Sequence, residues 1–167
     1  MNHEPSENTE LLIPPEIDDL LAVGIWPKTH EASCRQNGCP LVSTADLQRL
    51  IPEEDQLYLL APPFRNLWDH DEPADWYGPQ KNRPSLMNTQ LLLMIANFEI
   101  GVEAFIALDY QTSRERPSVL YFHNSYTSPS FFERLTVPAL RGRRFRHGTY
   151  RQIAPDFRTF AEAIGLL

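Results

Sequence analysis

The residue types best suited to hold a metal ion lie close together in the segment HEASCRQNGC, which contains His30, Cys34 and Cys39. Thiolates and imidazoles are ligands that zinc prefers. The spacing H-x3-C-x4-C is loose, however, and no second Cys/His pair follows at the distance typical of zinc-binding modules. We therefore favour a polar loop with two reduced thiols over a metal site, and we expect no metal and no other cofactor.

Catalysis by a cysteine or serine nucleophile would need a histidine and an orienting acid that the fold brings together. The histidines are scattered along the chain, and no G-x-S-x-G motif occurs. Asp109 ends an apolar run beside Tyr110, where a carboxylate could serve a partner or a proton transfer. We favour an aspartate that caps the backbone of a turn. A small hydrolase built from Asp109, His123 and a cysteine is the weakest of our hypotheses, and we expect no enzyme.

The most unusual segment is WDHDEPADWY at positions 68–77, which combines four acids with three large aromatic residues. Aromatic side chains anchor protein interfaces, and carboxylates steer basic partners toward them. The predicted partner-binding residues are Trp68, Asp69, Asp71, Glu72, Asp75, Trp76 and Tyr77. The alternative is a proline-rich loop whose tryptophans pack back onto the core. Asp69, His70 and Asp71 also invite a metal interpretation, which we rank low because adjacent loop residues rarely converge on one ion.

A basic run, RGRRFRH, occupies positions 141–147. Such a run could contact nucleic acid or an acidic patch. In a protein with a formal charge of -7 we favour a solvated loop, or an internal partner for acidic segments. The glycine-rich phosphate-binding motifs G-x-x-x-x-G-K-S/T and G-x-G-x-x-G are both missing from the sequence.

The composition is that of an ordinary globular protein, with 42% hydrophobic and 22% charged residues among 167. Residues 1–80 carry 15 acids and 4 bases, whereas residues 81–167 carry 7 acids and 11 bases. The acidic half argues against nucleic-acid binding and suits a basic partner protein. The N-terminus lacks the pattern of a secretory signal, and the longest apolar runs are too short to cross a bilayer. We therefore expect a cytoplasmic protein without a membrane or nucleic-acid partner.

Apolar periodicity predicts an α+β fold with flanking helices on a mostly antiparallel sheet. Residues 1–12 are expected to be flexible and residues 13–167 to form a single domain. Helices are predicted at 16–23 and 45–51 and from Pro155 to Gly165, and strands at 56–61, 91–98, 103–110 and 117–122. The segment 25–42 is expected to be a loop with short extended pieces, and the segments 62–89 and 123–149 are expected to be irregular. The short connection 111–116 predicts a hairpin between the last two strands.

Three motifs in the second half of the chain carry a resemblance to a known family. They are ALDY at 107–110, P-x-V-L-Y at 117–121 and the closing I-A-x-x-F-x-x-F-x-x-x-I-G at 153–165. Weaker similarity extends to PPEIDDLL and LVSTADLQRLI in the first half. With these motifs the chain resembles the SUKH superfamily, which contains a yeast regulator of cell-wall synthesis and many bacterial immunity proteins. The matched fold-signature residues are Asp109, Tyr110, Pro117, Phe157 and Phe160.

The resemblance implies a SUKH-like single domain with helices beside a sheet and without catalytic residues. In bacteria it implies a cytoplasmic immunity protein that binds and neutralises a cognate toxin, often a nuclease or deaminase delivered between cells. The acidic half of the chain adds the expectation that this toxin is basic. The alternative is a scaffold or regulatory protein of the same fold with a housekeeping partner. The identity of the toxin and the oligomeric state are left open.

Replacing Asp75 and Trp76 together with alanine is expected to weaken partner binding by several kcal/mol, because a few hot-spot residues carry most of the binding energy of an interface. Titration calorimetry with the captured partner measures the change. Unchanged affinity of the double variant would show that the segment 68–77 is not the binding surface.

Overall fold

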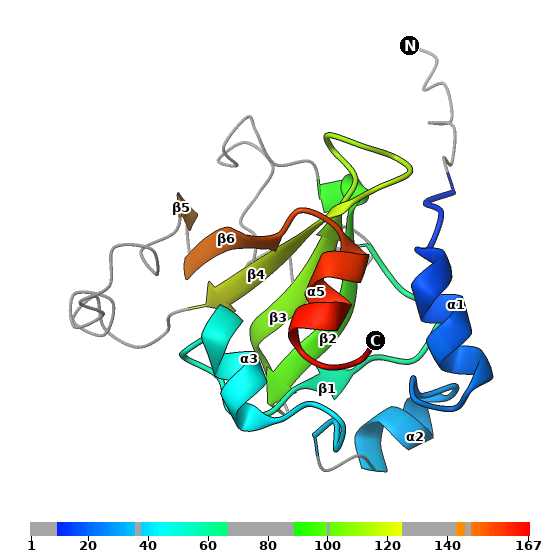
Figure 1. Cartoon of the computed structure of the whole chain (residues 1–167). Coiled ribbons are helices and arrows are strands. Elements are labelled where there is room, and N and C mark those ends of the chain that lie inside the picture. Colours follow the sequence, from blue (N-terminus) through cyan, green and yellow to red (C-terminus); the bar gives the residue numbers. More distant parts are fainter. Residues whose placement is uncertain (1–9, 36–37, 67–88, 100, 125–142, 146–147) are drawn as a thin grey trace.

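The computed structural model describes residues 10–35, 38–66, 89–99, 101–124, 143–145 and 148–167. Within these ranges helices pack on an antiparallel sheet, which confirms the predicted α+β class (Figure 1). The helices are α1 (Pro15–Ala22), α2 (His30–Arg35), α3 (Thr44–Leu50) and α5 (Phe157–Ala163), and a short 3-10 helix, η2, spans Thr89–Leu91. The strands are β1 (Tyr58–Leu59), β2 (Leu92–Glu99), β3 (Gly101–Asp109), β4 (Ser118–Asn124), β5 (Arg143–Phe145) and β6 (Gly148–Ala154).

The six strands form one sheet in the order β1-β2-β3-β4-β6-β5, with every neighbouring pair antiparallel. The hairpin predicted around residues 111–116 is present: Asp109 of β3 lies opposite Ser118 of β4, and Ala104 lies opposite His123. Chain order and spatial order therefore agree from β1 to β4, and short connections join β2 to β3 and β3 to β4.

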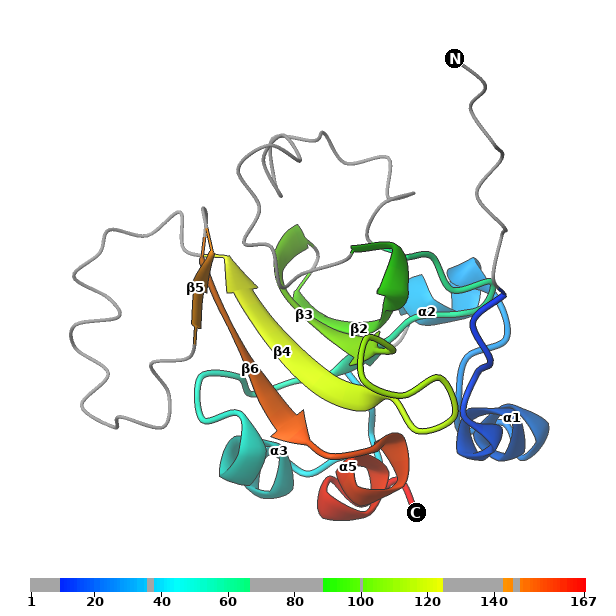
Figure 2. The same ribbon diagram turned by 90° about the horizontal axis from the view of Figure 1, so that it is seen from above.

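The two faces of the sheet carry two separate apolar clusters, because successive side chains of a strand point to opposite faces. In β3, Ile106, Leu108 and Tyr110 at its end belong to the larger cluster, which also contains the buried residues of the helices. Phe105 and Ala107 belong to the smaller cluster on the other face. Seen from above, α3 and α5 lie on the same side of the sheet (Figure 2).

An aromatic row crosses three strands within the smaller cluster. The rings of Phe105 and Phe122 stack with centroids 4.7 Å apart, and the rings of Phe122 and Tyr150 stack at 5.5 Å. Aromatic pairs of this kind contribute about 0.5–1.5 kcal/mol beyond their buried area. The row therefore fixes the relative positions of β3, β4 and β6 from this side.

Local sequence explains where the helices begin and end. Pro15 stands in the first turn of α1, where its missing amide hydrogen costs nothing, and Gly24 adopts a positive φ of 79° after the helix. Ser43 caps α3 by accepting a hydrogen bond from the Asp46 amide at 3.1 Å. Helix α5 ends at Ala163, and Gly165, which follows the C-cap Ile164, has a φ of 80°.

Several predicted elements were wrong in detail. Residues 25–42 are not simply irregular, because α2 forms within them after Thr29, whose hydroxyl accepts from the Ala32 amide. The segment 123–149 was expected to be irregular, yet β5 lies inside it and β6 starts at Gly148. The strand predicted at 56–61 is only Tyr58–Leu59 long.

The last helix starts later than predicted. Pro155 was expected in its first turn, but α5 begins at Phe157. Asp156 is its N-cap, since its carboxylate accepts a hydrogen bond from the Thr159 amide. The predicted apolar face of this helix is confirmed, because its members are all buried. They are Phe157, Phe160, Ala161 and Ile164.

A buried ion pair joins the sheet to the loop after α3. Arg151 of β6 donates from both terminal nitrogens to the Glu53 carboxylate, at 2.8 and 2.9 Å, and the Glu53 side chain is only 4% exposed. The Arg151 guanidinium also lies over the ring of Tyr121, 4.8 Å from its centroid. The Tyr121 hydroxyl donates to Glu54 at 2.7 Å. Burial, reinforced by the Glu54 carboxylate, raises the pKa of Tyr121, so this hydroxyl stays protonated and remains a donor.

Replacing Glu53 with alanine is expected to lower the free energy of unfolding by about 3 kcal/mol or more, because a buried arginine loses its counter-charge. Urea denaturation followed by circular dichroism measures the loss. The matched control is Glu31→Ala, which removes an exposed pair with Arg35 and should cost less than about 1 kcal/mol. Equal effects of the two changes would contradict a structural role for the buried pair.

Candidate functional site

The fold-signature residues of the β3–β4 hairpin have structural roles. The Asp109 carboxylate accepts hydrogen bonds from the backbone amide of Gln111 at 2.9 Å and from its side-chain amide at 3.0 Å. The Tyr110 hydroxyl donates to the Leu12 carbonyl at 2.6 Å, and burial raises the pKa of this tyrosine. Pro117 is buried just before β4. Asp109 is thus the turn-capping aspartate that the sequence favoured.

The other two signature residues belong to the core beneath the sheet. The ring centroids of Phe157 and Phe160 of α5 are 6.0 Å apart, and those of Phe157 and Trp26 are also 6.0 Å apart. The Trp26 indole nitrogen donates to the Leu60 carbonyl at 2.7 Å. These contacts join α5 to the loop after α1 and to the segment after β1.

The register of the hairpin separates the residues that the hydrolase hypothesis needed together. Asp109 pairs with Ser118 at one end of β4, whereas His123 lies five residues further along that strand. At about 3.4 Å per residue their backbones are roughly 17 Å apart. The set Asp109, His123 and a cysteine is therefore not one catalytic centre.

The two cysteines of the segment 30–39 lie in different environments. Cys34 of α2 is exposed, with its sulfur 3.5 Å from Nε2 of His30, whereas Cys39 is buried and contributes to the core. Among the residues that the structure describes, no three His, Cys, Asp or Glu side chains are grouped to hold a metal ion. The one hydroxyl of α2 that reaches the sheet is that of Ser33, which donates to the Leu59 carbonyl at 2.9 Å.

Two sequence-predicted surfaces lie wholly or partly outside what the structure describes. All the predicted partner-binding residues, from Trp68 to Tyr77, fall within 67–88, which is not described. Of the basic run 141–147, the structure describes only 143–145, as the edge strand β5. In the described ranges, no helix has the length and apolar character needed to span a membrane.

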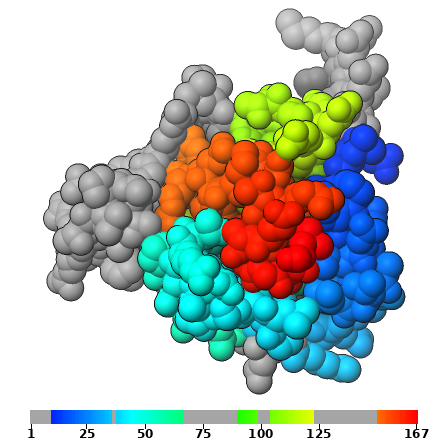
Figure 3. Space-filling model, in the orientation of Figure 1, coloured from blue at the N-terminus to red at the C-terminus, as the bar shows by residue number. Residues whose placement is uncertain are grey.

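The described surface does contain one pocket that sequence reasoning missed. It has a volume of about 290 Å³ and is lined by three tripeptides distant in sequence, residues 14–16, 115–117 and 156–158. These come from the start of α1, the β3–β4 turn and the start of α5, which meet on one face of the molecule (Figure 3). No sequence motif could have revealed this pocket, because only the tertiary fold brings its three parts together.

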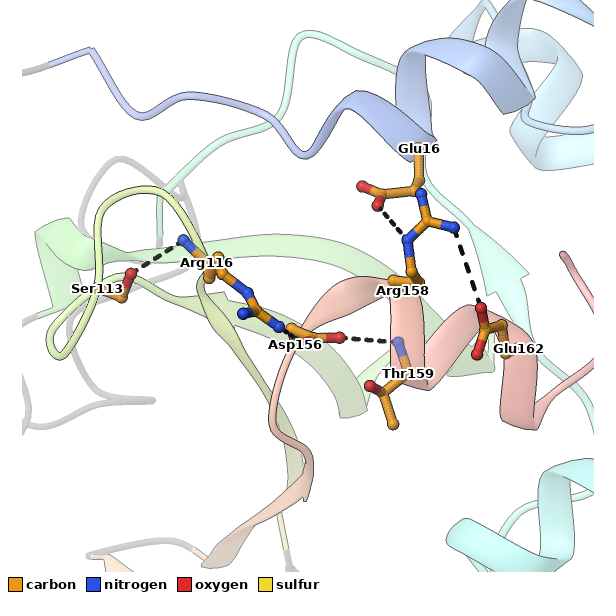
Figure 4. A network of polar contacts seen from close by, with 7 residues as sticks. All are labelled: Glu16, Ser113, Arg116, Asp156, Arg158, Thr159 and Glu162. Atoms are coloured by element: carbon orange, nitrogen blue, oxygen red, sulfur yellow. Dashed lines mark hydrogen bonds and ion pairs between the residues drawn. The ribbon is translucent and has the colours of Figure 1, made fainter.

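The charged side chains at this pocket are held in place by one another (Figure 4). Arg116 of the turn pairs with Asp156, while the backbone amide of Arg116 is bound to the Ser113 hydroxyl at 3.0 Å. Arg158 of α5 lies between two carboxylates, 3.0 Å from Glu16 of α1 and 4.0 Å from Glu162. The turn and both helices are thus linked by alternating charges.

Asp156 is the titratable group at this pocket whose pKa is clearly displaced. The Thr159 amide and the Arg116 guanidinium lower the pKa of Asp156 to about 2, because both stabilise the carboxylate. General acid–base catalysis near neutral pH favours groups with a pKa close to the working pH. Asp156 is therefore suited to hold charge and backbone in place.

In comparisons of this chain with protein-family models, with curated proteins and with solved structures, no match was found.

Replacing Asp156 with alanine is expected to lower the free energy of unfolding by about 1 kcal/mol at pH 6, since α5 loses its N-cap. The folded-state pKa lies below the ordinary value of 3.8, so the contribution of the charge is present above pH 3.8 and disappears as the pH falls toward 2. Urea denaturation of wild type and variant across this range should show the difference shrinking.

The control for this experiment is Glu162→Ala, which removes an exposed acid of the same helix without touching the cap. It should change the unfolding free energy by less than about 0.5 kcal/mol. A loss for Asp156→Ala that stays constant from pH 6 to pH 2 would contradict the assigned role of the charge.

Proposed function

We propose that this protein acts by binding a partner protein stoichiometrically, as an immunity protein that neutralises a cognate, basic toxin in the cytoplasm. The proposal combines the resemblance of the hairpin and C-terminal motifs to the SUKH superfamily with the character of the described surface. The toxin would be inhibited by occlusion of its active or substrate-binding surface. No cofactor and no chemical step are part of this function.

The observation that carries the proposal is the charged pocket between α1, the β3–β4 turn and α5. Surface ion pairs contribute only about 0–1 kcal/mol each to stability, so the fold alone does not require this concentration of charge. The side chains are nevertheless fixed in position by their partners and by backbone hydrogen bonds. Preorganised surface charge gives specificity and speed to association between proteins.

The immediate test is capture of the partner. Tagged protein is purified from its native cells at moderate salt, and what remains bound is identified by mass spectrometry. A single basic protein in near one-to-one yield, in particular the C-terminal part of a large secreted protein, is the expected result. Steering by opposite charge predicts that the association rate with that partner falls as salt increases.

The second candidate function is a scaffold or regulatory role with a housekeeping partner. Cells that lack the gene distinguish the two. Immunity predicts normal growth alone and sensitivity only beside siblings that carry the toxin. A growth or envelope defect in isolation, with several housekeeping proteins in the capture experiment, would overturn the immunity proposal.

A further inference from the structure

The pocket between α1, the β3–β4 turn and α5 has an excess of negative charge. Three carboxylates and two arginines line it. Both arginines are already neutralised, Arg116 by Asp156, and Arg158 by Glu16 and by the more distant Glu162. Glu115 is exposed, and no residue in the described ranges forms an ion pair with it. The charge left for a ligand to meet is therefore that of Glu115.

The exposed apolar residue of the lining is Pro15, at the start of α1. Pro14, Pro117 and Phe157 also line the pocket but are buried, so they present little surface to a ligand. Proline has a fixed φ and loses little entropy when a ligand covers it. An exposed proline ring beside an acid suits the methylene groups of a long side chain, which arginine and lysine bury while their charged ends reach the acid.

An anionic ligand fits this pocket less well. It would compete with Asp156 for Arg116, or with Glu16 for Arg158, to gain a counter-charge. Asp156 is held beside Arg116 because it is also the N-cap of α5, bound to the Thr159 amide at 2.8 Å. Glu115 would in addition repel the incoming anion.

We infer that this pocket receives a cationic side chain, arginine or lysine, from the partner protein, with Glu115 as its counter-charge. The inference rests on the proposed binding function and names the chemistry by which the partner is recognised. Arginine is among the residues most enriched at the centres of protein interfaces, where a fixed pocket can hold its guanidinium.

The first test uses a small probe and the full-length protein. N-acetyl-argininamide is titrated while amide NMR spectra are recorded, with N-acetyl-citrullinamide as the neutral probe of the same shape. We expect shifts of the amides of residues 115, 116, 157 and 158 with the arginine probe, and smaller shifts with the neutral one. Equal shifts with both probes, none with either, or shifts with acetate alone would overturn the inference.

Glu115→Gln is the matching variant, because it removes the charge and keeps the shape of an exposed turn residue. Binding of N-acetyl-argininamide should weaken by about threefold or more, as expected for one exposed charge pair. Glu31→Gln makes the same change on α2, away from the pocket, and should leave binding unaltered. Equal affinity of wild type and Glu115→Gln would refute the role of this carboxylate.

The captured partner separates failure of this inference from failure of the proposed function. If a single basic partner is captured and Glu115→Gln binds it as tightly as wild type, the function stands and the pocket assignment is wrong. If no partner is captured but the arginine probe binds in a Glu115-dependent way, the pocket chemistry stands and the immunity function is wrong.

Discussion

The structure depends on the burial of the aromatic rings of Trp26 and Phe157 between the helices and the sheet. The ring centroid of Trp26 lies 6.1 Å from that of Phe64 and 6.0 Å from that of Phe157. Its indole nitrogen donates a hydrogen bond to the Leu60 carbonyl. Burying a large aromatic side chain is among the strongest single contributions to folding, and a buried indole requires a hydrogen-bond acceptor. Three segments that the sequence separates widely are thereby held together.

The position of the charged pocket follows from this packing. Once Phe157 is buried, the residues on either side of it, Asp156 and Arg158, are directed to the surface at the start of α5. The short β3–β4 connection then brings Arg116 to Asp156, and the proline-led start of α1 brings Glu16 to Arg158. The core beneath these surface charges arranges them, which is why their ion pairs have a fixed geometry.

The sequence was sufficient to predict the elements whose signals are local. The hairpin around residues 111–116 and the buried face of α5 follow from apolar spacing, a short polar connection and a terminal glycine. Asp109 was correctly favoured as a turn cap, since an aspartate beside a tight connection commonly binds the backbone two residues on.

The elements that were missed depend on contacts distant in sequence. In β6, Arg151 occupies a position that faces the helices, and a charged residue there obscures the alternation expected of a strand. Only the pairing with Glu53, 98 residues away, makes that position compatible with burial. Helix α2 is six residues long and buries Ser33 alone, so it carries no apolar periodicity.

The candidate site could not be predicted because it too depends on contacts distant in sequence. Each lining tripeptide contains one or two prolines or a phenylalanine beside charged residues, a composition that also suits an ordinary solvated turn. What distinguishes the pocket is that three such turns meet, which is a property of the topology. Functional sites assembled from loops on a rigid scaffold are commonly of this kind.

The described ionisable groups with displaced pKa values hold segments of the fold and one surface charge in place. Active sites typically combine a cleft with groups whose pKa values are shifted toward the working pH. In the described part of this protein, burial raises the pKa values of Tyr110 and Tyr121, and both hydroxyls are used to tie segments of the fold together. At the pocket the shift goes the other way: the pKa of Asp156 is lowered, so its charge persists over the physiological range. Constant, positioned charge is what the proposed stoichiometric binder would need, because its partner must meet the same pattern at every encounter.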